Sequence, residues 1–350
     1  MSSLTVREAF WRWFWIGLIS AAVLLGFQAL SVGGPAGLLQ VGETSNLRPL
    51  IEDQLGEVPL AAGRGHDGQI FYAIGLDLSG QDLEGTIRDA GFRYRRILYP
   101  ALASAGGLLD GWGLLYGMIG VALLSSALAC GFVAAMATRS GTTNWFGLVV
   151  VLNPGIWLSV RLLTADLPAV AMIVGALFFV RSRQWTGAGL AALGVMTKEV
   201  HLATFLGPGF SRDRRNRMLL VAPLVALTTV VVWVSLTLGD GLAGGDNLSF
   251  PLVGIVDAVP NWESFGSRQW FYLVFALGSV GVGLVFTILH RGSMRWSLLA
   301  WSLLGLSMSS WVWNASNNAA RALAPIAILV VLSHLEQIEA NQAAGQSALS

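Results

Sequence analysis

The short stretch GHDGQIFY (65–72) contains the side chain best suited to act as a base, the carboxylate of Asp67. Apolar residues follow Asp67 at spacings that predict one face of a helix. A carboxylate at that position can accept a proton from an attacking hydroxyl group, or it can act as an N-cap by accepting backbone hydrogen bonds. The two roles are compatible, and the neighbouring His66 either tunes Asp67 or bonds to another neighbour.

A second stretch, FRYRRILYP (92–100), provides three guanidinium groups, those of Arg93, Arg95 and Arg96. Guanidinium groups bind phosphate oxygens in pairs, and basic clusters beside a membrane segment commonly bind anionic lipid headgroups. The cluster therefore predicts a phosphate-binding site. The alternative is that these side chains only extend to the membrane interface, with the tyrosines at headgroup level, and the sequence leaves both interpretations open.

The apolar stretch 184–210 is interrupted by Lys198, Glu199 and His201. Charged side chains inside a membrane segment are costly and are functional candidates by default. We therefore expect Lys198 to bind phosphate, and Glu199 and His201 to support the same site. The alternative is that Lys198 and Glu199 only neutralise each other and stabilise a turn.

Two further stretches contain candidate residues, which we expect to lie on the same side of the membrane as Asp67. RLLTADLP (161–168) contains Arg161 and Asp166. Asp166 is best explained as the cap of the following helix, which has a proline in its first turn, and a supporting role in the site is the alternative. In NASNNAARALAP (314–325), Arg321 opens the last apolar segment and is a second candidate to bind the leaving phosphate.

The composition indicates a polytopic membrane protein with an all-α fold, a transmembrane helical bundle. Hydrophobic residues make up 54% of the chain and charged residues only 12%, whereas a soluble domain usually carries about 25% charged residues. The net charge of +1 gives no indication of nucleic-acid binding, and RDRRNR (212–217) is more simply a cytoplasmic anchor. The single Cys130 excludes a disulfide framework and a thiol metal site. No compact metal-ligand spacing is present, so we expect no metal or other cofactor.

The apolar segments predict one membrane domain, residues 1–335, with about ten membrane segments. They cover about 10–30, 112–137, 144–160, 167–180, two short halves of 184–210, 217–238, 269–289, 296–313 and 319–335. Arginines and lysines in short loops tend to stay in the cytoplasm. The N-terminus and the connections that hold Arg139, Arg181 with Arg183, RDRRNR (212–217), and Arg291 with Arg295 are therefore predicted to be cytoplasmic. The first long loop, 31–96, is then predicted to lie outside. The first segment is long enough to be a retained anchor rather than a signal peptide. Residues 336–350 are predicted to be a disordered cytoplasmic tail.

Several motifs, taken in order, resemble those of a group of bacterial GT-C-type membrane glycosyltransferases. Related membrane proteins often carry YDGQ-F-Y, YR-RILYP, N-P…T-D-x-P, T-K-E-x-x-L and R-x-L-A-P. The matching stretches in this sequence are GHDGQIFY with FRYRRILYP (65–100), NPGIWLSVRLLTADLPAV (153–170), TKEVHLA (197–203) and NNAARALAP (317–325). The resemblance therefore spans most of the membrane region, roughly residues 60 to 330.

The resemblance implies a helical bundle whose first outer loop carries a catalytic acid and amphipathic helices. It also implies a polyprenyl-phosphate-linked sugar as the donor, used on the outer face of the cell membrane. Residue by residue, the matches are Asp67 for the acid, Arg93, Arg95 and Arg96 for the basic stretch, Lys198 and Glu199 for the K-E pair, and Arg321 for the late arginine. His66 stands where relatives usually have an aromatic residue, and without a large soluble C-terminal domain we expect loops to recognise the acceptor.

The resulting hypothesis is an inverting glycosyltransferase. Asp67 deprotonates the hydroxyl of a glycan, lipid or protein acceptor, which attacks the anomeric carbon opposite the lipid phosphate through an oxocarbenium-like transition state. Fixed cations stabilise the charge that grows on the leaving phosphate. A transporter or flippase for an anionic lipid or solute is the alternative, because broken helices with charged residues also occur in transporters. Transporters often have paired halves, however, and the charged first loop has no counterpart in the second half of this sequence.

Overall fold

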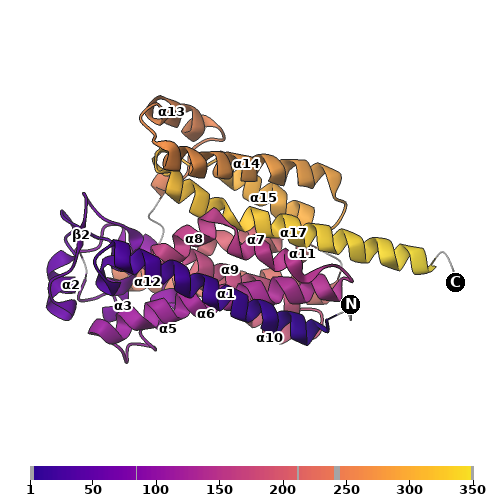
Figure 1. Cartoon of the computed structure of the whole chain (residues 1–350), viewed down its shortest axis with the longest axis horizontal. Helices are drawn as coiled ribbons and strands as arrows, with labels where there is room; N and C mark the ends of the chain where they lie inside the picture. Colours follow the sequence, from indigo (N-terminus) through magenta and orange to yellow (C-terminus); the bar gives the residue numbers. More distant parts are fainter. Residues whose placement is uncertain (1–3, 84, 211–212, 240–244, 348–350) are drawn as a thin grey trace.

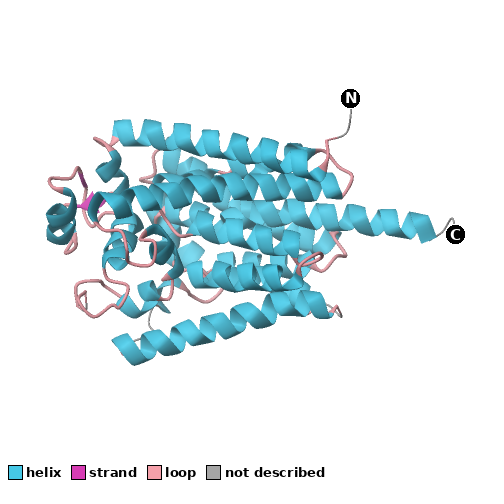
Figure 2. Cartoon of the chain, turned by 90° about the horizontal axis from the view of Figure 1, so that it is seen from below, coloured by secondary structure: helices cyan, strands magenta, loops and turns pink. Residues whose placement is uncertain are grey.

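The structure, a computed structural model, describes residues 4–83, 85–210, 213–239 and 245–347. Within these residues α-helices make up most of the molecule, joined by short 3₁₀-helices and a two-stranded sheet (Figures 1 and 2). The α-helices are α1 (Val6–Ser31), α2 (Arg48–Leu55), α3 (Asp67–Leu76), α4 (Ala90–Tyr94), α5 (Leu98–Ala103), α6 (Gly111–Arg139), α7 (Leu148–Val151), α8 (Pro154–Arg161), α9 (Asp166–Phe179), α10 (Gln184–Thr197), α11 (Leu206–Gly209), α12 (Arg214–Leu238), α13 (Val253–Trp262), α14 (Ser267–Leu289), α15 (Met294–Leu306), α16 (Ser310–Asn314) and α17 (Ser316–Ser347). The 3₁₀-helices are η1 (Pro35–Leu39), η2 (Asn144–Gly147), η3 (Glu199–Phe205) and η4 (Gly245–Asn247), and the strands are β1 (Val41–Gly42) and β2 (Leu60–Ala61).

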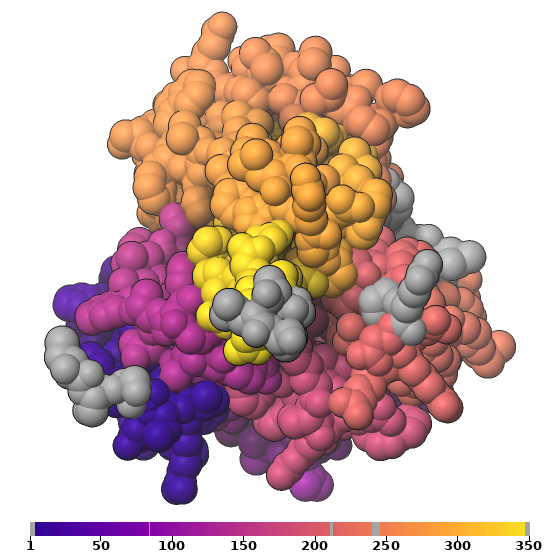
Figure 3. Space-filling model, turned by 90° about the vertical axis from the view of Figure 1, so that its right-hand side faces the viewer, coloured from indigo at the N-terminus to yellow at the C-terminus, as the bar shows by residue number. Residues whose placement is uncertain are grey.

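Five of the described helices, α1, α6, α12, α14 and α17, are long and apolar enough to cross a membrane. This finding confirms the all-α helical bundle and is compatible with a membrane protein. Viewed from the end at which α17 finishes, α17 lies between the α14–α15 pair and the earlier helices (Figure 3). Helices α2 and α3 lie at the opposite end of the bundle (Figure 1).

Helix α1 begins at a capping box that its sequence encodes. The Thr5 hydroxyl accepts a hydrogen bond from the Glu8 N–H at 3.2 Å, and the Glu8 carboxylate accepts one from the Thr5 N–H at 2.8 Å. The helix then packs along α6, where the Ser126 hydroxyl donates to the Gly17 carbonyl at 3.1 Å. A Cβ atom at position 17 would lie 2.8 Å from the Ser126 carbonyl oxygen, so only glycine permits this approach.

The long connection between α1 and α6 is folded. Strands β1 and β2 pair in parallel. The Gln69 side chain in α3 joins this region by accepting from the Gly42 N–H at 3.3 Å and donating to the Arg64 carbonyl at 2.6 Å. Helix α2 buries Ile51 and Leu55 on one face, as expected of an amphipathic helix. These contacts fix the start of α3.

The carboxylate of Asp77 organises the turn after α3. It accepts hydrogen bonds from the Ser79 hydroxyl and from four backbone N–H groups between Ser79 and Leu83. The Tyr94 phenol donates to the Asp77 carbonyl oxygen at 2.7 Å. Helix α4 is therefore tied to the end of α3, which keeps the arginine-rich stretch close to α3.

The predicted segment 144–160 is broken into η2, α7 and α8. The break falls at Asn153, whose side chain accepts hydrogen bonds from two backbone N–H groups in the first turn of α8. Pro154 comes next, and a proline disfavours a helical conformation in the residue before it while fitting the first turn of a new helix. The Asn-Pro pair therefore ends one helix and starts another.

The predicted stretch 184–210 breaks at Lys198, as its charges suggested. Helix α10 ends at Thr197, and Lys198 has an extended backbone with φ −158° and ψ 110°. The chain continues as η3 and then as the short α11 rather than as a second continuous helix. The predicted segment 296–313 is likewise divided between α15 and α16.

The prediction of a disordered tail from residue 336 is wrong for the described part of the tail, because α17 continues to Ser347 (Figure 2). Glu336 accepts hydrogen bonds from the hydroxyl and N–H of Ser293, and Glu339 accepts from the Ser140 hydroxyl and from Arg181. These contacts bind the helix extension to three other connections. Residues 348–350, and Arg212 of the basic RDRRNR stretch, lie outside the described residues.

Candidate functional site

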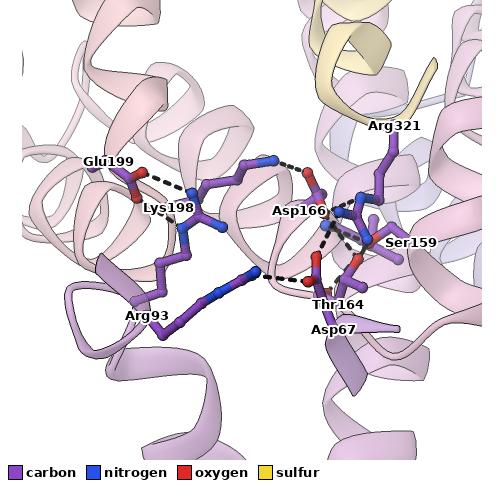
Figure 4. Close-up of polar contacts among 10 residues, drawn as sticks. Asp67, Arg93, Ser159, Thr164, Asp166, Lys198, Glu199 and Arg321 are labelled. Atoms are coloured by element: carbon purple, nitrogen blue, oxygen red, sulfur yellow. Dashed lines mark hydrogen bonds and ion pairs between the residues drawn. The ribbon is translucent and has the colours of Figure 1, made fainter. Parts of the chain in front are cut away.

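Asp67 is the first residue of α3, and both oxygens of its carboxylate are bound by arginines (Figure 4). Arg93 Nη1 donates to Oδ1 at 2.8 Å, and Arg321 Nη2 donates to Oδ2 at 2.7 Å. The N-cap residue of α3 is His66, whose side chain makes no capping hydrogen bond. The capping interpretation of Asp67 is therefore wrong, because His66 occupies the N-cap position and the Asp67 carboxylate binds arginines from distant segments.

Asp166, the first residue of α9, holds the second half of this network (Figure 4). Its Oδ1 accepts a hydrogen bond from Lys198, its Oδ2 accepts one from the Thr164 hydroxyl at 2.8 Å, and Arg321 Nε lies 3.2 Å from Oδ2. The Ser159 hydroxyl accepts the hydrogen bond from a backbone N–H in the first turn of α9, at 2.9 Å. The prediction that Asp166 caps this helix is therefore wrong, and its carboxylate belongs to the charged network.

Arg96 and Glu199 form a third buried contact. Arg96 Nε donates to Oε2 at 3.0 Å and Nη2 donates to Oε1 at 2.8 Å, which is the two-point geometry typical of a guanidinium and a carboxylate. Because Glu199 binds Arg96 and Lys198 binds Asp166, the alternative that Lys198 and Glu199 only neutralise each other is wrong.

Seven charged side chains, each no more than 22% exposed, make up this network. The cations are Arg93, Arg96, Lys198 and Arg321, and the carboxylates are Asp67, Asp166 and Glu199. Segments far apart in the sequence supply them: α3, α4 with the turn after it, α9, the α10–η3 junction and α17. Four cations face three carboxylates, so these seven side chains carry one uncompensated positive charge. A buried positive charge favours the binding of an anionic ligand.

The arginines also set the electrostatics of Asp67. Burial alone would raise the pKa of this carboxyl group, but the guanidinium groups of Arg93, Arg321 and Arg96 hold that pKa well below its usual range. Asp67 is therefore ionised at neutral pH and accepts protons weakly in this arrangement. Burial and the positive charge of Arg321 lower the pKa of His66, so its imidazole is neutral at pH 7.

The remaining predicted residues lie at or beyond the edge of the network. His201 is buried with its ring 5.1 Å from that of Trp301, centroid to centroid, so it packs behind Lys198. Arg95 lies over the ring of Phe92, 4.9 Å from its centroid. Arg161 ends α8 and takes part in none of the ion pairs found among the described residues.

Three residues in the site were not predicted from the sequence. The ring of Phe92 lies 4.4 Å from the guanidinium carbon of Arg96 and 5.7 Å from that of Arg93, so it serves as a platform for the arginines. Thr164 and Ser159 position Asp166 and the start of α9. Phe92 and Thr164 do stand inside the two charged motifs, but neither residue type signals a site by itself.

No protein-family model, curated protein or solved structure matches this chain. Among the described residues, no group of three or more histidine, cysteine, aspartate or glutamate side chains could hold a metal ion. The function is therefore inferred from the geometry and charge of the site together with the motif resemblance.

Proposed function

We propose that this chain is a membrane glycosyltransferase that moves a sugar from a polyprenyl-phosphate donor to an acceptor hydroxyl with inversion. The observation that supports this function best is the carboxylate of Asp67 held between two arginines, beside an uncompensated positive charge. Transfer from a lipid phosphate requires both a base for the acceptor hydroxyl and cations for the leaving phosphate. The motif resemblance points to the same reaction.

In the proposed reaction, the donor phosphate binds Arg93 and Arg321, and the other cations of the network add positive charge. The acceptor oxygen bonds to the anomeric carbon while the bond from that carbon to the phosphate oxygen breaks. The acceptor proton passes to Asp67, and the electron pair of the broken bond leaves with the phosphate, whose charge the arginines stabilise. Attack from the face opposite the phosphate inverts the configuration of the sugar carbon.

The proposed topology has about ten membrane segments, with the site toward the outer face of the cell membrane. Besides the five candidate spans, α7–α8, α9, α10, η3–α11 and α15 would be the shorter segments. Arginines from loops predicted to be cytoplasmic lie together: Arg139 donates to the Phe178 carbonyl at 3.1 Å, and Arg215 donates to the Arg181 carbonyl at 3.3 Å. Helix α9 leads from Asp166 in the site to this basic end, in agreement with the positive-inside rule.

The purified full chain, reconstituted in lipid nanodiscs, provides the test. It is incubated with a panel of undecaprenyl-phosphate sugars and with glycan or lipid acceptors. We expect glycosylated acceptor and undecaprenyl phosphate to form in equal amounts, with the anomeric configuration inverted by nuclear magnetic resonance. Movement of an intact lipid-linked sugar across liposomes without transfer would contradict the proposal and support the transporter.

A further inference from the structure

The contacts of Asp67 oppose its proposed role as a base. Asp67 has to accept a proton, yet each of its oxygens already accepts a hydrogen bond, from Arg93 at 2.8 Å and from Arg321 at 2.7 Å. The same two arginines are the cations proposed to bind the donor phosphate. The Asp67 carboxylate and the donor phosphate therefore compete for the same N–H donors of Arg93 and Arg321.

The arginines can change partner while staying in the site. Arg321 also lies against Asp166, which Lys198 and Thr164 hold from the other side, so its guanidinium keeps one anchor when Asp67 is released. The Nε atom of Arg93 is buried and makes no hydrogen bond within the described residues. The donor phosphodiester presents two non-bridging oxygens as acceptors, and these match the planar donors of arginine.

We infer that the donor phosphate replaces Asp67 on Arg93 and Arg321, so that donor binding itself frees the carboxylate to act as the base. The inference rests on the proposed function and adds an order of events to it. Without a donor, Asp67 stays paired and does not activate an acceptor. With the donor in place, the carboxylate oxygens become accessible to the acceptor hydroxyl.

The charge balance of the network agrees with this exchange. Four cations against three carboxylates leave one surplus positive charge, and a donor phosphodiester carries one negative charge that compensates it. After transfer, the leaving phosphate monoester carries close to two negative charges, while Asp67 has accepted a proton and is neutral. The network is therefore close to neutral both before and after the reaction.

The electrostatics of Asp67 change in the direction that catalysis requires. The arginines hold its pKa well below the usual range, whereas burial acts in the opposite direction. When the two arginines bind phosphate instead, burial remains and much of their attraction is lost. Asp67 then accepts a proton more readily, as an effective general base must.

The test measures binding of undecaprenyl phosphate to the full chain in nanodiscs, by native mass spectrometry. If Asp67 competes with phosphate for the arginines, Asp67→Asn should tighten binding by roughly tenfold, the factor expected from one charge-assisted hydrogen bond. Turnover of the same variant should fall, so affinity and rate should move in opposite directions. A merely structural role for Asp67 would weaken both.

Asp53→Asn is the matched control, because Asp53 is an exposed carboxylate on α2 in the same loop and its replacement changes the net charge equally. Its affinity should equal that of the wild type. Thermal unfolding checks that the variants fold, and Asp67→Ser is the second variant if Asp67→Asn does not. Equal or weaker binding by a folded Asp67 variant would overturn the exchange. It would not contradict the proposal that the donor is a lipid-linked phosphate. If neither the wild type nor the variant binds undecaprenyl phosphate, both the proposed donor and the proposed exchange are wrong.

Discussion

Asp67 differs from the other carboxylates of the first loop in what surrounds it. The Asp77 carboxylate accepts hydrogen bonds from the backbone of its own turn, and Asp53 is exposed on α2. We expect Asp67→Asn to lower sugar transfer by roughly 10²–10⁴-fold, the effect typical of losing a general base. The assay is acceptor glycosylation at a temperature at which both proteins are folded, and a variant with full transferase activity would refute the assignment.

Lys198 should matter through the carboxylate that it binds as well as through its own charge. Lys198→Ala leaves the buried Asp166 with fewer cations, so we expect weaker donor binding and a loss of roughly 3–5 kcal/mol of stability, as for broken buried ion pairs. Adding Asp166→Asn to Lys198→Ala should recover part of that stability, because the unpaired charge is removed. Thermal unfolding of the wild type, Lys198→Ala, Asp166→Asn and the double variant measures the coupling, and strictly additive losses would argue against a direct pair.

The pH dependence of stability should report the contacts of Asp67. Its pKa is lower in the folded chain than in the unfolded chain, so its contribution is fully present above the unfolded pKa of about 4. That contribution is lost as the pH falls from there toward the folded pKa. The difference in melting temperature between wild type and Asp67→Asn should therefore be largest near pH 7 and narrow below about pH 4. A difference that stays constant between pH 7 and pH 3 would contradict this account.

The sequence predicted most of the residues in the site but not their partners. Charge inside apolar segments pointed to Lys198 and Glu199, yet their contacts with Asp166 and Arg96 depend on how helices pack. Asp67 and Arg321 are 254 positions apart, and no local pattern can encode that pair. The two capping predictions failed for a related reason, since a cap was inferred from the neighbouring residues while tertiary contacts decided what the carboxylates bind.

The contact between α8 and α17 positions Arg321. A Cβ atom at Gly155 would lie 2.2 Å from the Ala320 carbonyl oxygen, in the residue before Arg321. Gly155→Ala should therefore push the helices apart, reduce stability by roughly 1–3 kcal/mol and lower transfer. Gly120→Ala is the control, because nothing lies within 4 Å of its added Cβ atom. Equal melting temperatures and activities for the two variants would show that α8 and α17 do not need this close approach.

The apolar segments predicted where the long helices occur but not how the shorter ones are divided. The segments that became α1, α6, α12 and α14 were recovered because long apolar runs have few alternatives in a membrane. The division of 144–160 at Asn153 follows from the local effect of Pro154, so the signal for this break was present in the sequence. The extension of α17 was missed because polar residues near a chain end resemble disorder, whereas Glu336 and Glu339 bind other connections.

Two groups of charged residues lie apart in the molecule. The charged network lies where α3, α9 and α17 begin, and α9 leads from it to Arg139 and Arg181. A base and its phosphate-binding cations are useful only on the side where donor and acceptor meet. The orientation of the chain in the membrane is therefore part of the functional hypothesis, and it can be tested without any substrate.

Cysteine labelling of intact cells tests this orientation. Single cysteines replace the exposed residues Asp53, Arg214 and Asp246 in a Cys130→Ala background. Because loop cations stay in the cytoplasm, a membrane-impermeant maleimide should label positions 53 and 246 from outside and position 214 only after permeabilisation. Labelling of position 214 in intact cells would reverse the orientation, place the Asp67 network on the cytoplasmic side and exclude a reaction at the outer face.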